Sequence, residues 1–241
     1  MQDALNNFRT SLQRIRNLAD DALANTAQAM KDPALRERHD TALSAVVVTM
    51  TGFFESFLRE VAEGYADTIC QQNHPFGNLK PNIRYTHFQG GGKVLSRIGG
   101  RNRSGWYSWT TATAVDLAKR LSSVNAGPPY DLVWEAFAET GGNPGSDVIR
   151  EFLKRFGVQR PIETLAQNVH LPSTPPFPPV PLSSQALSTL LDNFITIRNE
   201  CAHTGQAANA PPSANDVLYY CDLLENIAAG IVSTLTTHQV C

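Results

Sequence analysis

One run of about forty residues constrains the fold of this chain more than any other feature. Between residue 34 and about residue 72, apolar side chains recur at intervals of three and four residues. This spacing predicts a single long amphipathic helix whose apolar stripe lies at the centre of the core. The stripe comprises Leu43, Val46, Val47, Met50, Phe53, Phe54, Phe57, Leu58, Val61 and Tyr65.

Helical patterns also dominate the rest of the chain. Residues 2–29 form the first predicted helix, and Asp32-Pro33 ends it and starts the next. Further helices are predicted over 110–122, 131–138, 144–156, 161–169, from 183 or 184 to about 201, and over 214–236. We find no internal repeat and no convincing strand pair, so the sequence predicts one all-α domain over residues 1–241.

Composition narrows the class of protein further. Of the 241 residues, 42% are hydrophobic, enough for a sizeable core, and a net charge of −2 excludes general nucleic-acid binding through bulk charge. The N-terminus lacks a signal-peptide core, and the most apolar stretch, 45–54, is far shorter than the roughly 20 residues of a membrane span. Four scattered cysteines indicate reduced thiols. We expect a cytoplasmic protein without a membrane segment.

Two segments interrupt the helical pattern. Residues 74–108 contain clustered glycines and are predicted as a flexible basic insert. Residues 171–182 are rich in proline and must be extended, largely as polyproline II. The proline spacing suits either an SH3-like groove or a stiff surface loop between two helices, and we favour the loop.

The insert carries four cations within eleven residues and no acid among them. These are Lys93, Arg97, Arg101 and Arg103, and three aromatic residues, Trp106, Tyr107 and Trp109, follow. Cations that track phosphates beside rings that stack on bases are typical of proteins that bind single-stranded RNA. The alternative is a solvated loop whose aromatic side chains anchor it to the core.

The main chemical signal lies near residue 198. Arg198 follows Phe194 by four residues, so it extends an apolar stripe onto a face that is buried or at an interface, where it needs a carboxylate or phosphate partner. On a straight helix His203 points about 140° away. The two side chains converge only if the helix ends near Ala202, as Gly205 suggests, or if a second subunit completes the site. Alternatively, both merely favour the dipole of a helix end.

Three segments together resemble one family. The string 198–203, Arg-Asn-Glu-Cys-Ala-His, resembles the signature of HEPN domains, in which a histidine follows an arginine after four to six residues. Residues 53–60 and 143–157 resemble two further segments of the RiboL-PSP-HEPN and related stand-alone HEPN groups. The matches occur in the expected order and cover about residues 40–235.

The resemblance implies a HEPN-like helical bundle, usually a homodimer in which two signature motifs face each other. It also implies a metal-independent endoribonuclease that leaves a 2′,3′-cyclic phosphate and needs no cofactor. Arg198 would hold the scissile phosphate, His203 would act as general acid or base, and Asn199 would help orient them. Glu55 would hold Arg198 or polarise His203, unless it is only a surface carboxylate. The cysteine and histidine spacings complete no metal-binding set.

Many HEPN proteins belong to toxin–antitoxin, abortive-infection or CRISPR-associated systems. The resemblance therefore implies a toxin or antiphage effector that acts on RNA, forms a homodimer and is controlled by an antitoxin or a second defence protein. The alternative is a non-catalytic helical subunit that binds RNA or serves as a scaffold in such a complex.

Overall fold

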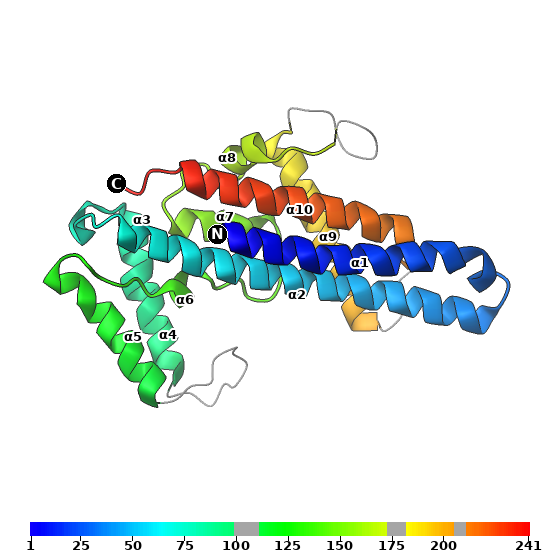
Figure 1. The fold of residues 1–241 in the computed structure, drawn as a ribbon, viewed down its shortest axis with the longest axis horizontal. Coiled ribbons are helices and arrows are strands. Elements are labelled where there is room, and N and C mark those ends of the chain that lie inside the picture. The colour runs from blue at the N-terminus through cyan, green and yellow to red at the C-terminus, as the bar shows by residue number, and fades with distance from the viewer. Residues whose placement is uncertain (99–110, 173–181, 205–210) are drawn as a thin grey trace.

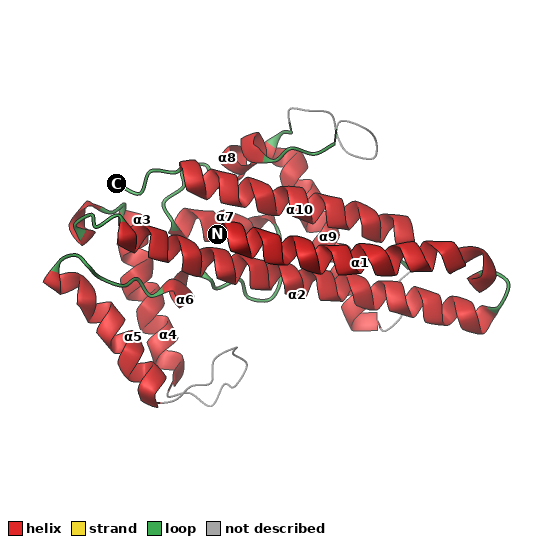
Figure 2. Cartoon of the chain, in the orientation of Figure 1, coloured by secondary structure: helices red, strands yellow, loops and turns green. Residues whose placement is uncertain are grey.

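The computed structural model describes residues 1–98, 111–172, 182–204 and 211–241. Within these ranges the chain is helical and contains no β-strand (Figure 2). The predicted all-α fold class is therefore confirmed.

Four long helices build the body of the molecule. They are α1 (Gln2–Ala29), α2 (Pro33–Gln71), α9 (Ser184–Thr204) and α10 (Ala214–Thr237). Helix α1 packs against both α2 and α10, while α9 packs against α2, so α2 lies at the centre of the bundle (Figure 1). The short helix α8 (Pro161–Asn168) covers α10 and also contacts α9.

Shorter elements cluster near the end of α2. They are η1 (Phe76–Asn78), α3 (Pro81–Tyr85), the π-helical turn η2 (Thr86–Gly90), α4 (Gly91–Ile98), α5 (Thr111–Ser123), η3 (Val124–Ala126), α6 (Trp134–Phe137) and α7 (Ser146–Arg155). Figure 1 shows α4 and α5 as an arm beside the long bundle. A buried ion pair ties this arm to α6, because Arg120 reaches both carboxylate oxygens of Glu135 at 2.8 and 2.6 Å.

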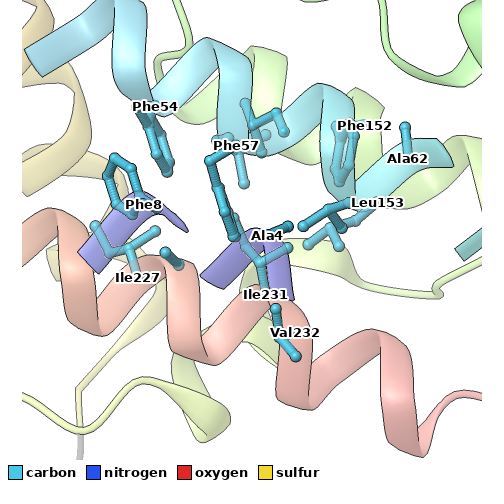
Figure 3. Packing of buried hydrophobic residues seen from close by; sticks show 14 of the residues in the cluster. Ala4, Phe8, Phe54, Phe57, Ala62, Phe152, Leu153, Ile227, Ile231 and Val232 are labelled. Atoms are coloured by element: carbon cyan, nitrogen blue, oxygen red, sulfur yellow. The ribbon is translucent and has the colours of Figure 1, made fainter. Parts of the chain in front are cut away.

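The apolar stripe of α2 forms the core as predicted. Phe54, Phe57, Leu58 and Val61 are at most 1% exposed, and the ring of Phe8 from α1 packs against both phenylalanines, with centroid distances of 5.7 and 5.2 Å (Figure 3). By length and composition α2 is also apolar enough to cross a membrane. In this fold, however, its central apolar side chains are covered by α1, α9 and α10, as in the core helix of a globular bundle.

Capping contacts mark the starts of α2 and α10, both of which the sequence predicted. The Asp32 side chain accepts a hydrogen bond from the Ala34 amide at 2.9 Å, and Pro33 occupies the first turn of α2. At the start of α10, Ser213 and Asp216 form a reciprocal capping box.

The expectation of an irregular insert over residues 74–108 is wrong for residues 76–98. This segment forms η1, α3, η2 and α4, and it buries Leu79, Ile83 and Val94. Two of its glycines allow close packing between elements: a Cβ at Gly90 would lie 2.8 Å from Cβ of Ala136, and a Cβ at Gly91 would lie 2.8 Å from Cδ2 of Leu121. The rest of the insert, residues 99–108, and most of the proline-rich segment, residues 173–181, lie outside the described residues.

Candidate active site

Arg198 lies where α9 faces α2 and the segment between α6 and α7. It continues the stripe of Leu191 and Phe194, both fully buried, and is itself partly buried with its Nε atom shielded from solvent. Its Nη1 atom donates hydrogen bonds to Oδ1 of Asn143 and Oδ1 of Asn199, each at 3.0 Å. The guanidinium is thus held by two neutral amide oxygens.

A contact between α7 and α9 fixes the segment that carries Asn143. Asp192 of α9 accepts hydrogen bonds from the backbone amide and the hydroxyl of Ser146, both at 2.9 Å, and so caps the start of α7. Gly142 adopts a φ of +88°, a left-handed conformation that favours glycine. The result places Asn143 against Arg198.

Glu55 of α2 lies beside the same segment, since a Cβ at Gly142 would be 3.9 Å from its Oε1 atom. That oxygen is buried and has no hydrogen-bond partner in the described part of the chain. Burial raises the pKa of the Glu55 carboxyl, and the nearby charges of Arg198 and Arg59 offset only part of the rise. The charge of Arg198 acts on Glu55, but the two form no ion pair among the described residues. Glu55 is thus a partly buried carboxylate beside Arg198, and its role in the site stays a prediction.

His203 lies apart from this cluster. The described part of helix α9 runs to Thr204, two residues beyond the predicted end near Ala202, so it includes His203, whose side chain is exposed. Continuous helical geometry separates the directions of Arg198 and His203 by about 140°. One of the two arrangements that bring these residues together, a helix end before His203, is therefore absent. The other arrangement, in which a second subunit completes the site, stays a prediction.

The basic residues of the insert take different positions. Lys93 lines a cleft between α4 and α7, whereas Arg97 forms an ion pair with Glu139. Arg101 and Arg103 lie outside the described residues. His87, which precedes these cations in the sequence, is fully buried, and this burial lowers its pKa. It therefore adds no surface charge to the group.

Asn143 is the site residue that sequence reasoning missed. It opens the 143–157 segment that resembles the HEPN groups and follows two glycines, but no periodicity marks its contact with a helix 55 residues later.

Among the described residues, no three His, Cys, Asp or Glu side chains gather into a group that could hold a metal ion.

The family resemblance implies RNA cleavage at Arg198, and replacing Asn143 by alanine is then expected to lower that cleavage by about 10- to 100-fold, because a hydrogen bond to a charged group contributes about 1.5–3 kcal/mol. The loss should be measured as kcat/KM on a labelled RNA, with Asn25→Ala, an exposed asparagine of α1, as the matched control. Cleavage at the parent rate by Asn143→Ala would show that this contact does not position Arg198.

In a comparison with protein-family models, residues 9–237 match the RiboL-PSP-HEPN family. Comparisons with curated proteins and with solved structures give no match. The match covers α2, α9 and α10, all of α1 from residue 9 onward, and all three segments whose resemblance was noted above. It supports a nuclease or RNA-related role in general. The chain belongs to the RiboL-PSP-HEPN family.

Proposed function

We propose that this protein is a metal-independent endoribonuclease whose active centre combines Arg198 of one subunit with His203 of a second copy. Asn199 and Asn143 orient Arg198, and Glu55 sets the electrostatic environment behind it. Membership of a HEPN family supports this proposal, because HEPN domains are typically ribonucleases.

The observation that carries the proposal is the state of Arg198. Its guanidinium is partly buried, bonded to two amide oxygens and beyond 4.0 Å from the carboxylates of the described residues. A partly buried positive charge without an anionic partner is costly, and the planar guanidinium matches a phosphate well. A site that already holds the arginine through neutral groups is therefore suited to receive an anion.

RNA supplies its own nucleophile, so the chemistry needs few groups. A general base removes the proton of the 2′-OH, and the 2′-oxygen forms a bond to the adjacent phosphorus. The bond from phosphorus to the 5′-oxygen breaks as a general acid protonates that oxygen. The products are a 2′,3′-cyclic phosphate and a 5′-hydroxyl. His203 is one of these proton-transfer groups, and Arg198 stabilises the charge that develops on the phosphoryl oxygens.

Because Arg198 and His203 point in different directions on α9, an active centre that pairs them across two subunits can be tested with mixed dimers. If Arg198 acts with His203 of the partner, equal amounts of Arg198→Ala and His203→Ala chains will form some mixed dimers with one intact centre. After denaturation and refolding together, random pairing should restore about a quarter of parent activity. Each inactive variant refolded alone is the control. No recovery, with mixed dimers demonstrated by differential tagging, would contradict a centre that pairs these residues across subunits.

The cellular role belongs to the same proposal. We propose that the protein is a cytoplasmic toxin or antiphage effector, restrained by an antitoxin or a second defence protein. An unrestrained ribonuclease of this kind would stop growth, so controlled expression of the parent chain should arrest cells, whereas expression of His203→Ala should not.

A further inference from the structure

A cleft of about 340 Å³ lies where α3, η2 and α4 face α6 and α7, apart from Arg198. Its volume falls in the range of small-molecule sites. The side chains that give it its chemical character are Asn82, Tyr85, Gln89, Lys93, Lys154 and Arg155. Lys154 and Arg155 lie in the 143–157 segment that resembles the HEPN groups, and Lys93 was predicted to contact RNA, but the candidate active site uses none of these six residues.

Arg155 gives the cleft a partly buried positive charge. Its Nη1 atom donates hydrogen bonds to the backbone carbonyls of Phe137 and Glu139, at 3.1 and 2.5 Å. Among the described residues, no carboxylate oxygen lies within 4.0 Å of the guanidinium nitrogens. Burial lowers the pKa of Arg155, and the charges of Glu139 and Glu151 offset only part of this. The guanidinium is therefore suited to an added anion.

The acids that line the cleft are already paired. Glu139 forms an ion pair with Arg97, and Glu151 forms one with Lys154 at 3.3 Å. Lys93 forms no ion pair within the described part of the chain. The charge left uncompensated in the cleft is therefore positive, which favours a phosphate over a cationic or neutral ligand.

The opposite wall offers an aromatic ring and two amides. Tyr85 is 62% exposed and has no ring partner among the described residues. Asn82 uses its Nδ2 atom to donate to the Lys154 carbonyl at 2.9 Å, which leaves its Oδ1 atom as an acceptor. Gln89 lies in the π-helical turn, a feature frequent at functional sites. Exposed rings stack on bases, and amides can bond to base edges.

We propose that this cleft binds one nucleotide unit of a single-stranded RNA, with the phosphate at Arg155 and Lys93 and the base stacked on Tyr85. Gln89 and Asn82 then face the edge of the base. The inference rests on the proposed function and adds a binding position apart from the bond that is cut. Glu139 at the cleft and Asn143 at Arg198 are four residues apart, at most about 14 Å of chain, so a strand of a few nucleotides reaches both.

The test measures binding without cleavage. In a His203→Ala background, fluorescence anisotropy of a labelled single-stranded RNA of about ten nucleotides gives Kd over a range of salt concentrations. Tyr85→Ala should raise Kd about five-fold or more through lost stacking, whereas Tyr85→Phe should bind like the parent. Lys93→Gln should raise Kd and reduce the salt slope by about 0.7. Lys119→Gln, an exposed lysine of α5 outside the cleft, should change neither.

Competition experiments distinguish binding of an RNA strand from binding of a free nucleotide or phosphate. AMP and inorganic phosphate, added as competitors at the RNA concentration, should leave the RNA bound. Displacement by AMP at that concentration would overturn the proposal in favour of a free-nucleotide site. Parent-like Kd values for both Tyr85→Ala and Lys93→Gln, with unchanged circular dichroism, would also overturn it.

The outcome does not depend on whether the protein cuts RNA. If the parent protein fails to cleave but Tyr85→Ala and Lys93→Gln weaken binding, the proposed function fails and the cleft assignment stands. If the parent cleaves and both cleft variants bind normally, only the cleft assignment fails.

Discussion

His203→Ala is expected to reduce RNA cleavage by about 10²–10⁴-fold, the usual contribution of a general acid or base. Folding should change little, because the side chain is exposed in the last turn of α9 and its loss creates no cavity. Single-turnover cleavage of a labelled RNA measures the first effect. Urea unfolding measures the second, and we expect a difference within about 0.5 kcal/mol.

The matched control for this prediction is His170→Ala, since His170 is an exposed histidine outside α9. It should cleave at the parent rate. A loss of folding in His203→Ala together with the loss of cleavage would assign His203 a structural role at the end of the helix. Equal rates for His203→Ala and the parent would remove His203 from the active centre.

Phe57→Ala is expected to lower the free energy of unfolding by about 3–5 kcal/mol, the usual cost of truncating a buried phenylalanine. Phe57 is 1% exposed, and its ring centroid lies 5.2 Å from that of Phe8 and 6.0 Å from that of Phe54. Figure 3 shows these three rings together between α1 and α2. Removing the Phe57 ring opens a cavity between α1 and α2, so urea unfolding should shift to a much lower midpoint.

The control for the core prediction is a second aromatic truncation at the surface. Tyr85→Ala removes a side chain that is 62% exposed, so its free energy of unfolding should lie within about 0.5 kcal/mol of the parent value. If Phe57→Ala also unfolds at the parent midpoint, the packing of α1 on α2 does not stabilise the fold as described.

The long helices could be predicted because each has a clear helical period in its sequence. Helix α2 combines a stripe of buried residues with a cap at Asp32, and both are local properties of the sequence. The insert could not be predicted in this way. Gly90 and Gly91 ordinarily indicate a break, whereas here they admit Ala136 and Leu121 at short range, a contact that depends on tertiary packing.

In the candidate site, too, local features could be predicted from the sequence, whereas contacts between distant elements could not. The partial burial of Arg198 follows from its position four residues after Phe194. Its contact with Asn143 depends on how Asp192 caps α7, which is a contact between elements 46 residues apart. The direction in which His203 points relative to Arg198 depends on where α9 ends. The glycine at position 205 predicts a helix end nearby, but it does not determine whether His203 lies inside the last turn, as it does in the structure.

The most direct test of the central claim is incubation of total cellular RNA with the purified protein in EDTA, followed by analysis of the new RNA ends. The parent should cut and leave 2′,3′-cyclic phosphate and 5′-hydroxyl ends, whereas Arg198→Ala and His203→Ala should not cut. RNA that is bound but not cut by the parent, or cutting that is equal in all three proteins, would contradict an active centre built from Arg198 and His203.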